Sequence, residues 1–244
     1  MSPIAVATYF WQPDEGSKFA APYTVDDVRR LQRAVARNLT VPHEFVVITD
    51  RPELFVDDPV THIRVVPINW ATHVPGTCYV RLMTFHPNGA EIFGADRMLQ
   101  IDLDTLIVGN IDHLVNRSED LVLWRNPARH PSRPGRAIYN TSILLHELGT
   151  IPEVWQTFVD MKSEGKSIPA KDDQWYLSDA FGEDMPFFDG VCDGVYRIAR
   201  ADTPGSGVHG VLPDNACIVF FTGSEGKWTN PTIRDANPWV EAYL

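Results

Sequence analysis

Two carboxylates, Asp102 and Asp104, stand one residue apart inside an apolar run from 97 to 108. If this run is one extended strand, its side-chain period of two places both carboxylates on the same face. Bare carboxylates among apolar neighbours repel each other and are poorly solvated, and a divalent cation relieves both costs. Mg²⁺ and Mn²⁺ commonly bind one or two carboxylates together with substrate phosphates. The D-x-D spacing therefore predicts a metal and phosphate site, while a strand-end cap followed by a turn stays open as an alternative.

The segments that must position this pair alternate between strand and helix patterns in the first half of the chain. Apolar and β-branched runs predict strands over 4–11, 45–49, 62–68, 97–108, 121–124, 138–145, 194–199 and 216–221. Helices are expected after Thr24, from about 79 to 93, over 152–164 and over 172–181. This order is typical of an α/β fold with a mixed, mostly parallel central sheet flanked by helices. Residues 126–136 and 203–210, rich in Pro, Gly or Arg, are interpreted as mobile loops.

The helix expected after Thr24 has one apolar face and several arginines on its other faces. The arginines are Arg29, Arg30, Arg33 and Arg37. We interpret them as a solvated helix face rather than as an anion site.

Composition excludes several classes of protein. The 244 residues include 21 Lys and Arg against 32 Asp and Glu, and the formal net charge of −11 disfavours stable binding to nucleic acid or an anionic membrane. The 44% apolar content is sufficient for a core. No apolar run is long enough to span a membrane, and the first residues lack a basic signal-peptide region. Three widely separated cysteines favour a reducing compartment, so a cytoplasmic location is expected.

Five blocks in the chain resemble, in order, segments of GT-A glycosyltransferases. The resemblance is nearest to family 8, the glycogenin- and galactosyltransferase-like enzymes. The blocks are Y-V-R-L at 79–82, the D-x-D segment at 97–111, Y-N-T-S-I-L-L at 139–145, D-Q at 173–174, and C-I-V-F-F-T-G with K-W at 217–228. The opening strand and the strand at 45–50 also fit, so the resemblance spans nearly the whole chain.

The resemblance implies one GT-A (Rossmann-like) domain over 1–244. Its nucleotide-binding half would cover about 1–112, and its sugar and acceptor half about 113–244. The implied activity is transfer of a hexose from a nucleotide-sugar, UDP-glucose or UDP-galactose, to an acceptor hydroxyl with retention of configuration. Mn²⁺ or Mg²⁺ on Asp102 and Asp104 would assist the transfer.

The resemblance also assigns roles to individual residues. Gln174 would stabilise the β face of the sugar, Asp173 would hold a sugar hydroxyl, and Asn140 would bind the donor sugar. Donor-binding residues would be Ala7, Thr8, Tyr9, Asp50, Arg81, Asp102, Leu103, Asp104, Gly223, Lys227 and Trp228. Purely structural roles stay open as alternatives. They are a helix-start charge for Asp173, a turn cap for Asn140, a surface lysine for Lys227 and a surface ion pair for Arg81.

The chain departs from the family pattern at three positions. Phe220 stands where the family has a histidine as third metal ligand, so water or His209 would fill that position, or metal binding would be weak. Ser142 replaces a glycine beside the donor sugar, and the proline between Lys227 and Trp228 is missing.

Two other functions fit the D-x-D signal less well. A glycosyltransferase-like fold kept only for binding would explain Phe220. A phosphatase with a D-x-D-x-T motif would need its threonine one residue later than Thr105. The acceptor is left open as a glycan, a protein, a small molecule or a modified nucleobase, and so is the oligomeric state.

Overall fold

The computed structural model of the chain describes residues 3–12, 23–55, 62–127, 135, 137–168, 171–199, 207–221 and 227–244. Its strands form two sheets. The larger has the order β3 (Ile63–Pro67), β2 (His43–Thr49), β1 (Ile4–Phe10), β4 (Arg97–Ile101), β7 (Tyr139–Glu147), β6 (Leu121–Arg125) and β8 (Phe187–Phe188). The smaller has the order β5 (Thr105–Ile107), β10 (Ile218–Phe220) and β9 (Val195–Arg197).

The larger sheet is mixed but mostly parallel, as the sequence predicts. β3, β2, β1 and β4 run parallel, and so do β6 and β8. β7 is antiparallel to both β4 and β6. The carboxyl ends of β1, β2 and β4 therefore meet at one edge of the sheet, which is where α/β folds usually bind ligands.

Helices cover both faces of the larger sheet because its central strands are apolar on both sides. Along β1, Ile4, Val6 and Phe10 pack with α1 (Val25–Asn38) and α3 (Asp112–Val115). The alternate residues Ala5, Ala7 and Tyr9 pack with the other helices. These are η3 (Tyr79–Phe85), α2 (Gly89–Phe93), α4 (Pro152–Ser163) and α5 (Asp173–Phe181).

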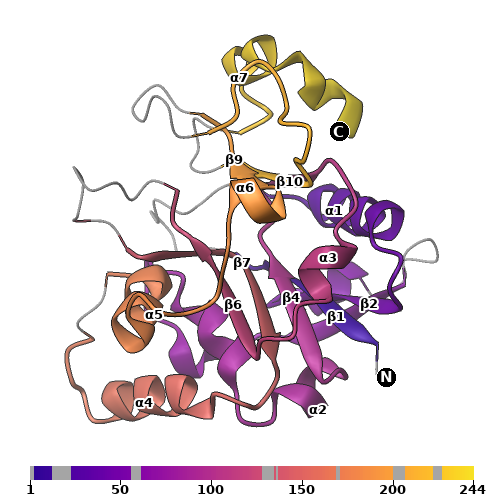
Figure 1. Ribbon diagram of the computed structural model, residues 1–244. Coiled ribbons are helices and arrows are strands. Elements are labelled where there is room, and N and C mark those ends of the chain that lie inside the picture. Colours follow the sequence, from indigo (N-terminus) through magenta and orange to yellow (C-terminus); the bar gives the residue numbers. More distant parts are fainter. Residues whose placement is uncertain are drawn as a thin grey trace.

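The smaller sheet has a separate apolar cluster with the C-terminal segments α7 (Pro231–Ala236) and η5 (Pro238–Tyr243). Figure 1 shows β9, β10 and α7 at the top of the view, with α4 and α5 at the lower left. The short elements η1 (Pro52–Phe55), η2 (Trp70–Thr72) and α6 (Gly190–Asp193) complete the described chain. No helix within the described ranges combines the length and apolar character needed to cross a membrane.

Two sequence predictions about these elements are wrong. The single strand over 97–108 is instead two strands in different sheets, β4 and β5, with a bend at 102–104 between them. The single helix from 79 to 93 is instead η3 and α2, interrupted at Pro87, which has no backbone N–H to donate. The predicted loop over 126–136 lies largely outside the described residues.

Candidate active site

The Asp102–Asp104 pair lies in a tight turn at the carboxyl end of β4. The Asp102 N–H donates to the carbonyl of Ser142 (2.8 Å), and the Asp102 carbonyl accepts from Thr105 Oγ1 (2.6 Å). The Asp104 carbonyl accepts from the Phe221 N–H (2.7 Å), which directly follows β10. The structure therefore shows the strand-end turn that the sequence left open as an alternative. This turn joins the two sheets.

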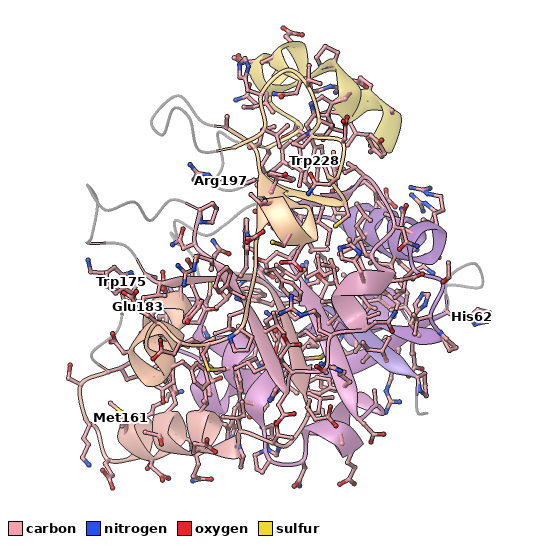
Figure 2. The ribbon with its side chains drawn as sticks, in the orientation of Figure 1. His62, Met161, Trp175, Glu183, Arg197 and Trp228 are labelled. Atoms are coloured by element: carbon pink, nitrogen blue, oxygen red, sulfur yellow. The ribbon has the colours of Figure 1, made fainter. Side chains whose placement is uncertain are left out.

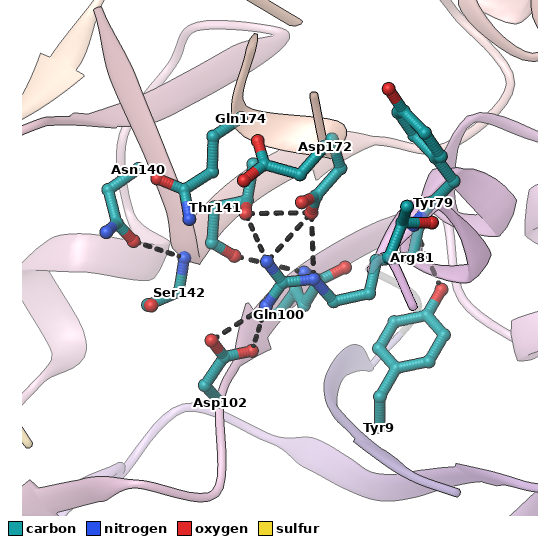
Figure 3. A network of polar contacts seen from close by, with 12 residues as sticks. Tyr9, Tyr79, Arg81, Gln100, Asp102, Asn140, Thr141, Ser142, Asp172 and Gln174 are labelled. Carbon is teal, nitrogen blue, oxygen red and sulfur yellow. Dashed lines mark hydrogen bonds and ion pairs between the residues drawn. The ribbon is translucent and has the colours of Figure 1, made fainter. Parts of the chain in front are cut away.

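Arg81 of η3 ties this turn to α5 through a buried network (Figure 3). Its Nη1 donates to both carboxylate oxygens of Asp102, at 2.6 and 2.7 Å. Its Nε donates to Asp173 Oδ2 (2.8 Å), and its Nη2 lies 2.8 Å from the same oxygen and also donates to Thr141 Oγ1. The Thr141 hydroxyl in turn donates to Asp173 Oδ2 (2.8 Å). Arg81 is 6% exposed, so it is not a surface ion pair.

Asp173 is the most deeply buried carboxylate of this network, at 1% exposure. It is the first residue of α5, and the N-cap is its neighbour Asp172, whose side chain accepts from the Trp175 N–H. Burial raises the pKa of Asp173 to about 6, although the Arg81 charge acts to lower it. Its second oxygen, Oδ1, has no hydrogen-bond partner among the described residues. That buried oxygen therefore has an unused capacity to accept a hydrogen bond.

Asp104 is influenced electrostatically by a second cation, Lys227, whose Nζ is buried. Burial raises the pKa of Asp104 to about 7, the charge of Asp102 adds to this rise, and Lys227 and Arg81 oppose it. Lys227 Nζ is buried without a hydrogen-bond partner in the described part of the chain, and it lies 3.6 Å from the ring centre of Tyr23. Burial lowers the pKa of Lys227, while the charge of Asp104 raises it. Lys227 is therefore not a freely solvated lysine.

Other predicted residues lie at the same sheet edge. Tyr9 donates through its hydroxyl to the Arg81 carbonyl (3.2 Å), and Asp50 accepts from the Gln12 N–H at 3.2 and 3.3 Å. Asn140 Oδ1 accepts from the Ser142 N–H (2.8 Å), and Figure 3 shows Asn140 and Gln174 beside the Arg81 network. Ala7, Thr8 and Leu103 are buried. Gly223 lies outside the described residues.

Sequence reasoning missed three residues of this region: Thr141, Tyr23 and Arg30. Arg30 was expected on a solvated face, but it is 8% exposed and bonds to the turn. Trp228 is also buried, with the Arg30 guanidinium 4.2 Å from its ring centre and Phe221 packed edge-on at 5.4 Å. Figure 2 shows Trp228 beside the smaller sheet.

The residues present fit a divalent cation only incompletely. No group of three His, Cys, Asp or Glu side chains that could hold a metal occurs among the described residues. Both oxygens of Asp102 already accept hydrogen bonds from Arg81. Phe220 is fully buried with its ring 4.7 Å from that of Trp124, and His209 is exposed. The described residues therefore supply two carboxylates and no third ligand.

The fold described above matches that of solved glycosyltransferases. The galactosyltransferase LgtC, solved with donor and acceptor sugar analogues, aligns over 98% of this chain and 94% of its own, with a TM-score of 0.58 and 14% identity. GlyE of Streptococcus pneumoniae TIGR4 aligns over 100% of this chain and 60% of its own, with a TM-score of 0.64 and 14% identity. Mouse xyloside xylosyltransferase 1 aligns over 89% of this chain and 97% of its own, with a TM-score of 0.51 and 10% identity.

The chain has the GT-A fold. The sequence matches no protein-family profile and no curated protein. The fold is thus shared at 10–14% identity, and the side chains at the carboxyl ends of β1, β2 and β4 must carry any conclusion about chemistry.

Proposed function

We propose that this GT-A protein is a retaining glycosyltransferase that moves a hexose from a nucleotide-sugar, UDP-glucose or UDP-galactose, to an acceptor hydroxyl. The observation that carries the proposal is the buried network of Arg81, Asp102 and Asp173. It lies at the sheet edge where α/β folds bind nucleotides, and it leaves one carboxylate oxygen without a partner. Such a hydrogen-bond acceptor suits a sugar hydroxyl better than a phosphate.

The proposed transfer exchanges one bond at the anomeric carbon. The bond to the diphosphate oxygen breaks, the acceptor oxygen bonds on the same face of the sugar, and the acceptor proton leaves with the diphosphate. The Lys227 ammonium would stabilise the negative charge on the departing diphosphate, because it is a buried cation without a hydrogen-bond partner in the described chain. Asp173 Oδ1 would hold a sugar hydroxyl, Gln174 would face the sugar ring, and Asn140 would bind the donor sugar.

Similarity to LgtC supports these roles. That galactosyltransferase binds donor and acceptor sugar analogues, and a glutamine-to-glutamate variant of it is described as an active-site mutant. Gln174 is the glutamine that the D-Q block suggests as the counterpart. A xylosyltransferase shares the fold as well, so the hexose is inferred from the family 8 resemblance alone.

A divalent cation on Asp102 and Asp104 stays a prediction. Two carboxylates leave most coordination positions of Mn²⁺ or Mg²⁺ to donor phosphates and water. A bound ion would act as a Lewis acid on the diphosphate. The cytoplasmic location also stays part of the proposal, and it rests on the wide separation of Cys78, Cys192 and Cys217 in the sequence.

Calorimetric titration of UDP tests the donor site. UDP should bind wild-type protein. The Asp104→Asn substitution should change the affinity of the protein for UDP at least tenfold, whereas Asp160→Asn, at an exposed position, should leave this affinity unchanged. Repeating the titration with Mn²⁺ and with EDTA decides the metal prediction. Turnover of UDP-glucose or UDP-galactose, followed as UDP release, decides whether the protein is an enzyme.

Two outcomes would support the other candidates. If UDP binds and neither donor turns over with any acceptor class, the chain is a binding protein with a glycosyltransferase fold. Hydrolysis of an aryl phosphate that is lost in Asp102→Asn would favour the phosphatase.

A further inference from the structure

We infer that Arg30 of α1 is a positioning residue for the donor site, fixing the 102–105 turn against the segment that carries Lys227. The inference rests on the proposed function, since it names what holds the proposed phosphate-binding groups in place. It concerns a residue outside the five blocks that resemble family 8.

The Arg30 guanidinium bonds to the turn at two points on either side of Asp104. Nη2 donates to the Leu103 carbonyl (3.0 Å), and Nη1 donates to the Thr105 carbonyl (2.9 Å). The Asp104 carbonyl between them accepts from the Phe221 N–H, and the Asp102 carbonyl accepts from Thr105 Oγ1. All four carbonyls of the turn are thus bonded, and Arg30 supplies two of these bonds from 73 and 75 residues away along the chain.

The same guanidinium contacts the C-terminal segment through its flat face. It lies 4.2 Å from the ring centre of Trp228, next to Lys227 in the sequence. Lys227 Nζ in turn lies over the ring of Tyr23. Tyr23 precedes Thr24, the N-cap of the helix that carries Arg30. The Arg30 side chain therefore links α1 and the carboxylate turn to the segment that carries the proposed diphosphate-binding lysine.

Only arginine can make this set of contacts. Its planar fork presents parallel N–H donors to two carbonyls while its face stacks on an indole ring, whereas a lysine ammonium is a point charge that cannot do both. Arg30 is 8% exposed, and burying a cation is unfavourable unless its donors are paired. Nη1 and Nη2 are paired with the turn, while Nε has no hydrogen-bond partner among the described residues. Arg33, one turn further along α1, is exposed, so the helix itself does not require a buried arginine.

The fixed turn matters because phosphate binding depends on preorganised groups. Arg30 bonds to the carbonyls on both sides of Asp104 and stacks on Trp228 beside Lys227, so it fixes the backbone on which both proposed phosphate-site groups stand. If the turn moves, the enzyme must reorder it in each binding event, and donor affinity falls.

The test compares Arg30→Met and Arg30→Gln with the matched surface variant Arg33→Met. Hydrogen exchange of the Asp102 and Phe221 amides reports the turn and needs no ligand, since the Asp102 amide starts the turn and bonds to the Ser142 carbonyl, and the Phe221 amide bonds to the Asp104 carbonyl. UDP titration at a temperature far below each variant's Tm reports the site. We expect both Arg30 variants to exchange these amides at least tenfold faster and to bind UDP at least tenfold more weakly, while Arg33→Met matches wild type in both.

Each result decides a separate question. A lower Tm for the Arg30 variants with unchanged exchange at the two amides and unchanged UDP affinity would overturn the inference and leave Arg30 a packing residue. If wild-type protein binds no UDP, the proposed function fails. Faster amide exchange in the Arg30 variants would still show that Arg30 holds the turn in place. If Arg30→Met does not fold, Arg30→Gln decides, because it keeps one donor group and most of the volume.

Discussion

Replacing Arg81 by methionine should destabilise the fold strongly, because it leaves a buried carboxylate without its cation. Among the described residues, Arg81 provides the only charged donors to Asp173, which is 1% exposed and retains one bond from Thr141 after the change. Removing one partner of a buried ion pair costs about 3–5 kcal/mol. The half-exposed Asp102 is solvated by water and adds no more than about 1 kcal/mol.

Urea unfolding at pH 8 and pH 5 measures this cost. For a chain of this length, a loss of about 3–5 kcal/mol lowers Tm by roughly 6–20 °C. The pKa of Asp173 is already raised to about 6, above its unfolded value near 3.8, and it rises further without Arg81. The folded state of the variant therefore binds this proton more tightly than either its own unfolded state or folded wild type does. The stability difference between wild type and variant should then shrink as the pH falls from 8 to 5.

Two further variants make the reasoning refutable. Asp173→Asn in the Arg81→Met background should recover about 2–3 kcal/mol, because the unpaired charge is gone. Arg33→Met, the same change at an exposed site, should alter stability by less than about 0.5 kcal/mol. A deficit below about 1 kcal/mol for Arg81→Met, or one that is equal at both pH values, would refute the account of the network.

Three other predictions concern separate parts of the chain. Burial lowers the pKa of His146 to about 4, so stability should fall by up to ~3 kcal/mol as the pH drops from 6.5 toward 4. His146→Gln should lose that part of the acid sensitivity in urea melts, and an unchanged pH slope would contradict this. Gly194 has φ +68° and its added Cβ would lie 2.1 Å from the Asn215 carbonyl, whereas Gly165, at φ +67°, faces open space. Gly194→Ala should therefore cost about 3 kcal/mol and Gly165→Ala about 1 kcal/mol by thermal unfolding, and equal losses would argue against the close contact. Asp173→Asn should slow sugar transfer by roughly 10²–10³-fold, because its unpartnered oxygen becomes part of an amide. Asp172→Asn should stay within about threefold of wild type, since asparagine caps a helix as well as aspartate does.

The sequence predicts the local elements well where a local signal determines them. The helix after Thr24 is confirmed as α1, with Thr24 and Asp27 forming the capping box at its start. The same periodicity places Arg30 on a polar face, and this prediction is wrong. The residue that covers Arg30 is Trp228, far along the chain, and a helical period carries no information about such a neighbour.

The 97–108 run shows the same limit for strands. Its apolar pattern indicates extended structure, but not that 97–101 pairs with β1 and β7 while 105–107 pairs with β10. Thr105 bonds to the Asp102 carbonyl and closes the turn, and this local signal was available in the sequence.

The fold brings part of the candidate site together, while the roles that the resemblance implies for its residues stay predictions. Arg81, Asp102 and Asp173 come from three distant blocks and meet in one network. Thr141 was missed although it lies between Asn140 and Ser142, because a threonine in an apolar strand is indistinguishable from a packing residue until its partner is known.

The pairing of β5 with β10 bears on how the protein is made. Synthesis proceeds from the N-terminus at roughly 5–20 residues per second, so β1, β2, β3 and β4 leave the ribosome well before β10 exists. During that interval β5 has no strand partner, and the Asp104 carbonyl has no Phe221 amide to bond. A nascent or truncated chain can thus have most of its large sheet and still lack an ordered carboxylate turn. On the proposed function, donor binding would become possible only when the last third of the polypeptide has been translated.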